Sequence, residues 1–192
     1  GRSAAGALAD FVLDVSPETF IADLSNLNFM ITIRKAAVIG AGTMGAQIAA
    51  LLANVGIPSL LMDIVPGELQ PDEQARGLTL QSPEVRNRVT QTLFERAKKL
   101  SPAPFFTPEA ASLVRIGNVE DNLAEIKDAD WIIEAVLERM DVKLAIHARI
   151  AAHARPDALI TTNTSGLSIA GMTRDLPLEY RHRFFGAHFF NP

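Results

Sequence analysis

Short apolar runs alternate with amphipathic segments along most of the chain. Because a strand that is buried on both faces of a parallel sheet reads as a short continuous apolar run, these runs predict the strands of such a sheet. The predicted strands cover residues 36–39, 59–62, 113–116, 131–136, 158–161 and 184–187. Apolar residues at three- and four-residue spacing predict helices over residues 43–55, 82–100 and 140–154. The alternation predicts an α/β fold, with a doubly wound, mainly parallel sheet and helices on both faces.

Two stretches depart from this alternation. Residues 1–30 are acidic, and Arg2 is their single basic residue. A secretory signal has a basic start and an apolar core, and a transit peptide is rich in arginine, so the segment predicts neither. We interpret it as a leader or linker, and residues 31–192 as one domain. Residues 64–82 are rich in proline, glycine and polar side chains, and they predict a long loop inside that domain.

The composition narrows the classes of partner. The net charge is -4 and 48% of the residues are hydrophobic, which fits a folded domain. Because the chain lacks a strong basic field, nucleic acid and anionic membranes are poor partners. Its apolar runs are all shorter than the about 20 residues of a membrane span. The absence of cysteine removes disulfides, thiolate nucleophiles and cysteine metal ligands. We expect no metal site and a cytoplasmic location.

The turn after the first predicted strand carries a glycine pattern that suits a pyrophosphate. It reads Gly40-Ala41-Gly42-Thr43-Met44-Gly45. Gly40 permits the tight turn, Gly42 lets a phosphate approach the backbone, and Gly45 lets the following helix pack closely on the strand. The N–H groups and the dipole at the start of that helix attract phosphate. Such a turn is often only structural, but its place between strand and helix favours a Rossmann-type dinucleotide site.

An acid at the end of the second predicted strand indicates which dinucleotide would bind. The carboxylate of Asp63 can accept hydrogen bonds from the hydroxyls of the adenosine ribose, and it would repel a 2′-phosphate. Ile64 and Val65 follow, so the sequence places no arginine there to receive a phosphate. The pattern therefore predicts NAD rather than NADP. The alternative is that Asp63 is a solvated acid in a loop.

Four motifs, in a fixed order along the chain, carry a resemblance to a known family. They are Gly40-Ala41-Gly42-Thr43-Met44-Gly45, Ile133-Glu134-Ala135-Val136-Leu137-Glu138, Thr162-Asn163-Thr164-Ser165 and Gly186-Ala187-His188-Phe189-Phe190-Asn191-Pro192. With them, residues 31–192 resemble the NAD-binding, N-terminal domain of 3-hydroxyacyl-CoA dehydrogenases. The insertion after Asp63 is similar to that of bacterial fusions with an enoyl-CoA hydratase. The resemblance implies oxidation of L-3-hydroxyacyl-CoA to 3-ketoacyl-CoA with NAD, in fatty-acid β-oxidation. It also implies a helical C-terminal domain outside this chain and a homo-oligomeric parent protein.

The resemblance further assigns roles to individual residues. It implies that His188 is the catalytic base, that Ser165 hydrogen-bonds the substrate oxygen, and that Asn191 lies near the reacting centre. Histidine suits reversible proton exchange near neutral pH. Glu138 and Lys143 match positions that contact the cofactor. In the family, a glutamate downstream of the last motif orients the histidine. We expect that glutamate beyond the end of this sequence, and therefore little turnover by the chain alone.

Other interpretations of the same residues stay open. Outside its motif, His188 would be a satisfied histidine at a strand end. Ser165 would be a turn or cap residue, and Glu138 and Lys143 would be the solvated ends of a helix. The other histidines show no partner acid and are interpreted as structural or surface residues: His147, His153 and His182. The alternative functions are a dehydrogenase of a free 3-hydroxy acid and an NAD-binding module without chemistry.

Overall fold

The computed structural model describes residues 32–190, and Ile33–Pro192 form one of the two compact units of the chain. The expected leader, residues 1–30, lies outside the described residues. The strands are β1 (Ala36–Ile39), β2 (Ser59–Asp63), β3 (Val114–Asn118), β4 (Trp131–Glu134), β5 (Leu159–Thr162) and β6 (Phe184–Gly186). The described α-helices are α3 (Thr43–Asn54), α4 (Pro71–Ala75), α5 (Pro83–Arg86), α6 (Arg88–Ala97), α7 (Met140–His153), α8 (Ile169–Thr173) and α9 (Leu178–Arg181). The 3₁₀ helices Pro108–Leu113 and Leu123–Asp128 precede β3 and β4.

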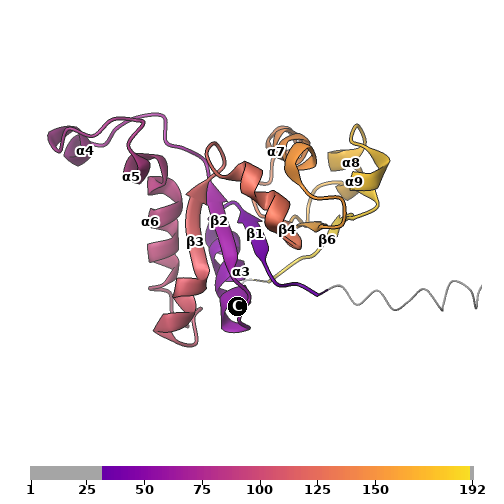
Figure 1. Cartoon of the computed structure of the whole chain (residues 1–192), viewed down its shortest axis with the longest axis horizontal. Helices are drawn as coiled ribbons and strands as arrows, with labels where there is room; N and C mark the ends of the chain where they lie inside the picture. The colour runs from indigo at the N-terminus through magenta and orange to yellow at the C-terminus, as the bar shows by residue number, and fades with distance from the viewer. Residues whose placement is uncertain (1–31, 191–192) are drawn as a thin grey trace, which may run out of the picture. The chain divides into compact units, whose positions relative to one another are not determined.

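The strands of the described residues form one parallel sheet in the order β3-β2-β1-β4-β5-β6 (Figure 1). The chain moves outward from β1 to β3, returns to place β4 beside β1, and moves outward again to β6. In such a sheet, ligands bind beyond the carboxyl ends of the strands, where the direction of winding reverses. The predicted doubly wound, Rossmann-type fold is confirmed, and its reversal point lies between β1 and β4.

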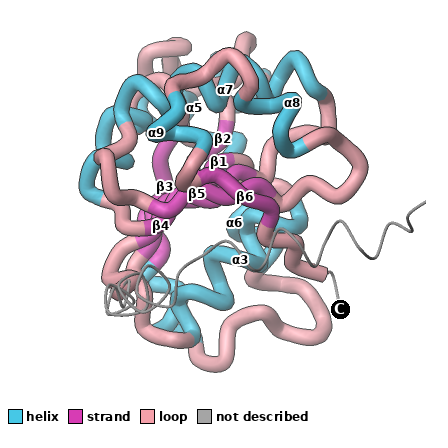
Figure 2. Tube along the Cα trace, turned by 90° about the vertical axis from the view of Figure 1, so that its right-hand side faces the viewer, coloured by secondary structure: helices cyan, strands magenta, loops and turns pink. Residues whose placement is uncertain are grey.

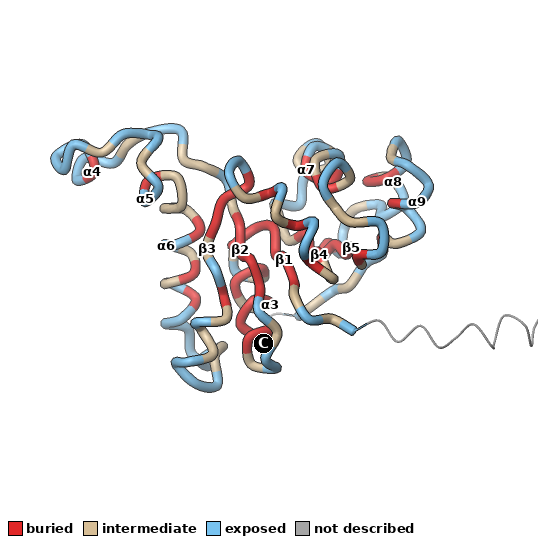
Figure 3. The backbone as a smooth tube through the Cα atoms, viewed as in Figure 1, coloured by how far each residue is buried: buried red, intermediate tan, exposed pale blue. Residues whose placement is uncertain are grey.

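Alternate residues of each strand face different layers of helices. Val38 of β1 belongs to the core that includes Leu52 of α3 and Phe94 of α6, whereas Ile39 belongs to the core that includes Ile150 of α7. Figure 2 shows α3 and α6 on one side of the sheet and α7, α8 and α9 on the other. Figure 3 shows that the strands between these layers are mostly buried. Because both faces are covered, the strands appear in the sequence as continuous apolar runs.

The segment between β2 and α6 is not the plain loop that the sequence predicts over residues 64–82. Helix α4 forms within it because Gln70 and Glu73 cap each other, and a proline occupies the start of the helix. Glu73 is buried and forms an ion pair with Arg88 at the start of α6. This ion pair ties α4 to α6, although α4 itself lies away from the sheet (Figure 1).

Several element boundaries also differ from the prediction. The helix predicted over residues 82–100 is divided at Asn87 into α5 and α6, and the Asn87 side chain accepts a hydrogen bond from Asn118 at the end of β3 (2.8 Å). The third strand begins after Leu113, which closes a 3₁₀ helix, and it continues until Asn118 pairs with Asp63. The ends of β2, β4, β5 and β6 differ by one or two residues. Within residues 32–190, each helix is too short or too polar to cross a membrane.

Candidate active site

The turn between β1 and α3 packs closely against the residues that follow β4. The middle of the turn, at Gly42, has free space beside it. Gly40 adopts a φ of 99°, where glycine is favoured, and a Cβ at this position would lie 2.5 Å from the carbonyl oxygen of Ala135. A Cβ on Gly45 would collide with the carbonyl oxygen of Gly40. Gly42 faces open space, since no described residue lies within 4 Å of an added Cβ. A phosphate therefore has room beside the start of α3, where the first N–H groups lack partners within the helix.

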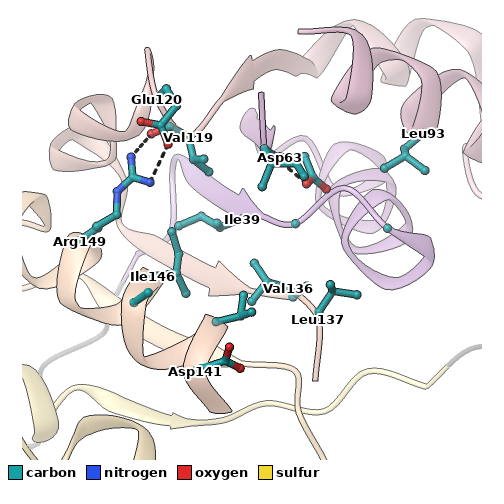
Figure 4. A pocket seen from close by; sticks show the side chains of 16 residues that line it. Ile39, Asp63, Leu93, Val119, Glu120, Val136, Leu137, Asp141, Ile146 and Arg149 are labelled. Carbon is teal, nitrogen blue, oxygen red and sulfur yellow. Dashed lines mark hydrogen bonds and ion pairs between the residues drawn. The ribbon is translucent and has the colours of Figure 1, made fainter. Parts of the chain in front are cut away.

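A cavity of about 620 Å³ opens beside this turn at the carboxyl end of the sheet. Gly40 and Gly42 line it. Asp63 lines it too, together with apolar side chains such as Ile39 (Figure 4). Asp63 Oδ2 accepts a hydrogen bond from the N–H of Ala41 (2.6 Å), and Oδ1 accepts one from the N–H of Ile64 (2.7 Å). These bonds orient the carboxylate and leave each oxygen a further lone pair for a ligand hydroxyl. The volume and the apolar walls suit an adenosine group.

A fixed guanidinium borders this larger cavity on the side of α7. Arg149 donates to the carboxylate of Glu120 (2.9 Å) and to the carbonyl oxygen of Val119 (2.6 Å), as the dashed lines in Figure 4 show. Both acceptors follow β3, so these bonds join α7 to the end of that strand. The sequence does not reveal Arg149 as a cavity residue, because an arginine on a helix is ordinarily a solvated side chain.

A second cavity, of about 220 Å³, adjoins the first. Ala135 and Val136, which follow β4, line both cavities. The remaining lining residues of the smaller cavity are Met44, Glu138, Lys143, Asn163, Thr164, Ser165 and His188. The glycine turn and His188 therefore line adjoining cavities at the same edge of the sheet.

Glu138 holds the loop that carries Ser165. Its Oε1 accepts hydrogen bonds from the Thr164 hydroxyl (2.7 Å), the Gly166 N–H (2.8 Å) and the Ser165 N–H (3.3 Å). The Thr164 hydroxyl, followed by the Gly166 amide, lowers the pKa of Glu138 below its ordinary value, so this carboxylate is ionised at neutral pH. Glu138 is exposed, and its carboxylate has three partners within the protein.

A buried ion pair joins Lys143, which lines the smaller cavity, to Glu134, which does not. Lys143 is 1% exposed and donates to Oε1 of Glu134, which is 0% exposed (Nζ to Oε1, 2.6 Å). The N–H of Val136 and the hydroxyl of Thr162 donate to the same carboxylate at 2.8 and 2.7 Å. Burial by itself would raise the pKa of Glu134, but the nearby imidazole of His147 and the hydrogen bonds from Lys143 and Thr162 outweigh it and hold the pKa below its ordinary value. The interpretation of Lys143 as a solvated helix end is wrong.

His147 completes this cluster from the side away from the cavity. The expectation that it has no partner acid is wrong, since its Nε2 lies 3.4 Å from Oε2 of Glu134. Its Nδ1 lies 2.8 Å from the hydroxyl of Tyr180 on α9, and its ring packs edge-on against Phe184 of β6. Burial raises the pKa of the Tyr180 phenol, which therefore keeps its proton. These partners come from β4, α9 and β6, so spacing along the sequence could not reveal them.

Backbone hydrogen bonds on either side of His188 place it at the smaller cavity. The N–H of Phe189 donates to Oδ1 of Asn163 (2.7 Å), and the N–H of Ala187 donates to the carbonyl oxygen of Thr162 (3.0 Å). Both acceptors lie at the end of β5 or just after it. The segment that carries His188 is therefore anchored to the neighbouring strand, while its imidazole remains exposed.

Comparison with known families identifies the kind of domain to which these cavities belong. A family model described as the NAD-binding domain of 3-hydroxyacyl-CoA dehydrogenase matches residues 35–192. The chain belongs to this family. The match includes the glycine turn, the buried Glu134 and the segment around His188, and it confirms NAD as the cofactor of the family.

Relatives of this 3-hydroxyacyl-CoA dehydrogenase domain are longer proteins. A Bacillus subtilis protein that carries the name 3-hydroxyacyl-CoA dehydrogenase is 44% identical over 160 residues, which are 83% of this chain and 20% of the relative. A Rickettsia felis protein named as a fatty acid oxidation complex trifunctional enzyme is 33% identical over the same shares of the two chains. The crystal structure of 3-hydroxybutyryl-CoA dehydrogenase from Escherichia coli K12 matches with a TM-score of 0.55 and 32% identity, over 84% of this chain and 30% of that chain. The chain thus spans a minor part of each of these proteins.

Within this family, the roles of individual residues stay predictions. The structure brings Glu138, Lys143, Ser165 and His188 together around one cavity. Asn191 lies outside the described residues. Sequence reasoning missed the buried cluster beneath that cavity, although an acid inside an apolar strand is a usable signal. A carboxylate in such a position is costly unless it is paired, and it therefore indicates a basic partner from elsewhere in the fold.

Proposed function

We propose that this chain is the cofactor-binding part of an NAD-dependent dehydrogenase that oxidises the 3-hydroxyl of an L-3-hydroxyacyl-CoA in fatty-acid β-oxidation. The observation that carries the proposal is the adjacency of the two cavities, one bordered by the glycine turn and Asp63, the other by Ser165 and His188. Hydride transfer requires the nicotinamide and the substrate carbon to meet beside a base. A dinucleotide with its adenosine in the larger cavity would extend toward the smaller one. The names of the relatives support a CoA thioester as the substrate.

The residues around the larger cavity fit a dinucleotide. The pyrophosphate would lie against the open backbone at Gly42, with the N–H groups of Thr43 and Met44 and the dipole of α3 favouring its charge. Asp63 would accept hydrogen bonds from the hydroxyls of the adenosine ribose. Lys143 would contact the nicotinamide end in the smaller cavity, and Glu138 would lie beside it. Bound NAD supplies the acceptor for the hydride that leaves C3.

The proton chemistry would fall to residues of the smaller cavity. As the C3–H electron pair leaves and the carbonyl double bond forms, the imidazole of His188 takes the proton from the 3-hydroxyl. Ser165 would donate a hydrogen bond to the substrate oxygen and orient it, and Asn191 would lie near the reacting centre. In the reverse direction, the imidazolium of His188 returns the proton to the ketone oxygen.

Cofactor titration tests the first half of this proposal. The chain is expected to bind NADH in the micromolar range and NADPH more weakly, because Asp63 repels a 2′-phosphate. Asp63→Ala should weaken NADH binding by about 10- to 100-fold, as expected for the loss of hydrogen bonds to a charged acceptor. Asp175→Ala is the matched control, since Asp175 is an exposed acid that lines neither cavity. Unchanged NADH binding by Asp63→Ala would contradict the cofactor assignment.

The substrate class is tested on a chimera in which this chain replaces the matching residues of the longer Bacillus subtilis relative. Oxidation of NADH with acetoacetyl-CoA, and not with free acetoacetate, is the expected result. The opposite preference would favour the dehydrogenase of a free 3-hydroxy acid, and cofactor binding without any turnover would favour a binding module. The homo-oligomeric parent and the cytoplasmic location remain predictions.

A further inference from the structure

Lys143 lines the smaller cavity, and its ammonium faces the carboxylate of Glu134, which is buried and does not line the cavity itself. The ammonium of Lys143 has two acceptors in the structure, Oε1 of Glu134 at 2.6 Å and the carbonyl oxygen of Val136 at 3.5 Å. An ammonium has three N–H donors, so one is left for a group in the cavity that Lys143 lines. Because both charged side chains are almost fully buried, water screens them little. Their charges therefore act on whatever enters this cavity.

Three further groups lie around the Glu134 carboxylate. Val136 contributes a backbone N–H, Thr162 of β5 a hydroxyl, and His147 of α7 an imidazole whose other nitrogen faces the phenol of Tyr180 on α9. Among the described residues, Glu134 is the carboxylate that accepts a hydrogen bond from the ammonium of Lys143. Glu138, whose carboxylate lines the same cavity, acts on that ammonium from a greater distance.

We propose that Glu134 is a positioning residue that holds and neutralises Lys143, and that it thereby sets the relative affinity of the site for oxidised and reduced NAD. This inference rests on the proposed function, which places the nicotinamide in the smaller cavity. The oxidised nicotinamide ring carries a positive charge, whereas the reduced ring is neutral. An uncompensated ammonium would repel the oxidised form alone, so the charge of Glu134 keeps both forms bound, as a reversible hydride transfer requires.

The expected effect is large enough to measure. A unit charge about 7 Å from the ring, acting through an effective dielectric constant of about 30, changes the binding constant of a cation by about tenfold. The binding of the neutral reduced ring does not change in this way, because the ring carries no net charge. The quantity to follow is therefore the ratio of the dissociation constants for NAD⁺ and NADH, since general damage to the site weakens both cofactors and leaves their ratio unchanged.

The test measures this ratio by calorimetric titration of the chain at pH 8 with each cofactor. Glu134→Gln keeps the shape of the side chain and removes its charge, so the ratio should rise by about tenfold. Lys143→Met leaves the carboxylate uncompensated, and the ratio should fall. The double variant removes both charges, and its ratio should return to within about twofold of that of the unmodified chain.

Tyr180→Phe is the control for a structural effect, because it removes the hydroxyl that faces His147 and no charge from the cluster. It should lower the melting temperature of the chain and leave the ratio unchanged. An unchanged or lowered ratio in Glu134→Gln would overturn the inference. If that variant does not fold, a rise in the ratio for Lys143→Met, or an altered ratio in the double variant, would overturn it equally. Failure of the unmodified chain to bind either cofactor would instead refute the proposed function.

Discussion

Removal of the Lys143 ammonium leaves a carboxylate in the core without its nearest opposite charge. Lys143→Met keeps an unbranched side chain of similar length, so packing changes little while the ion pair with Glu134 is lost. Breaking a buried ion pair by removing one partner costs about 3–5 kcal/mol. The Val136 N–H and the Thr162 hydroxyl still donate to the carboxylate, which favours the lower end, about 3 kcal/mol. In a domain of this size, that corresponds to a fall of about 6–12 °C in melting temperature.

The assay is urea unfolding at pH 8, followed by the fluorescence of Trp131, the single tryptophan of the chain. Lys98→Met is the matched control, because the Lys98–Glu95 pair lies on the surface of α6 and contributes about 0.5 kcal/mol or less. The double variant Glu134→Gln/Lys143→Met should recover most of the lost stability, since it leaves no unpaired charge. If Lys143→Met were no more destabilising than Lys98→Met, the buried ion pair would not contribute as the structure implies.

Three further predictions follow from local contacts. Gly45→Ala should destabilise the domain by about 1–3 kcal/mol and weaken NADH binding, because its Cβ would collide with the glycine turn. Gly67→Ala, whose Cβ would meet no described residue within 4 Å, should change stability by less than about 0.5 kcal/mol in the same urea assay. The pKa of Glu134 is held below its ordinary value of 4.5. The stability that its carboxylate gives the folded domain is therefore complete above pH 4.5 and is lost as the pH falls through the lower pKa of the folded state. In Glu134→Gln, this part of the pH dependence of the urea midpoint should disappear. Asn163→Ala should leave the Phe189 N–H without its acceptor and cost about 1–3 kcal/mol, and unchanged hydrogen exchange at that amide would count against the anchoring of the His188 segment.

The succession of strands and helices, and the doubly wound parallel sheet, could be predicted from the sequence because the information is local and repeated. Each buried strand is a short apolar run, each crossover helix has its own period, and right-handed crossovers leave few arrangements of such units. Helix α4 was missed because its stability comes from a capping pair and from an ion pair with Arg88, which a count of apolar residues does not register. The division at Asn87 depends on a side-chain contact with β3, and is equally invisible in the sequence.

Within the candidate site too, some residues could be predicted from local sequence and others could not. The glycine turn and Asp63 could be identified because strand, turn, helix and the end of the next strand place them at one edge of the sheet without further information. Ser165 and His188 follow β5 and β6, so the topology alone brings them to that edge as well. The sequence by itself thus determined the fold, the family and the edge of the sheet where the candidate site lies.

Only the tertiary structure decided what lies behind that site. Glu134, Lys143, His147 and Tyr180 come from β4, α7 and α9, and they meet because α7 and α9 pack on the same face of the sheet that contains β4. Periodicity indicates that a side chain is buried, but the partner of a buried charge is chosen by packing between segments that are distant in the sequence. The charge balance of the smaller cavity is for this reason a property of the folded domain and not of any motif.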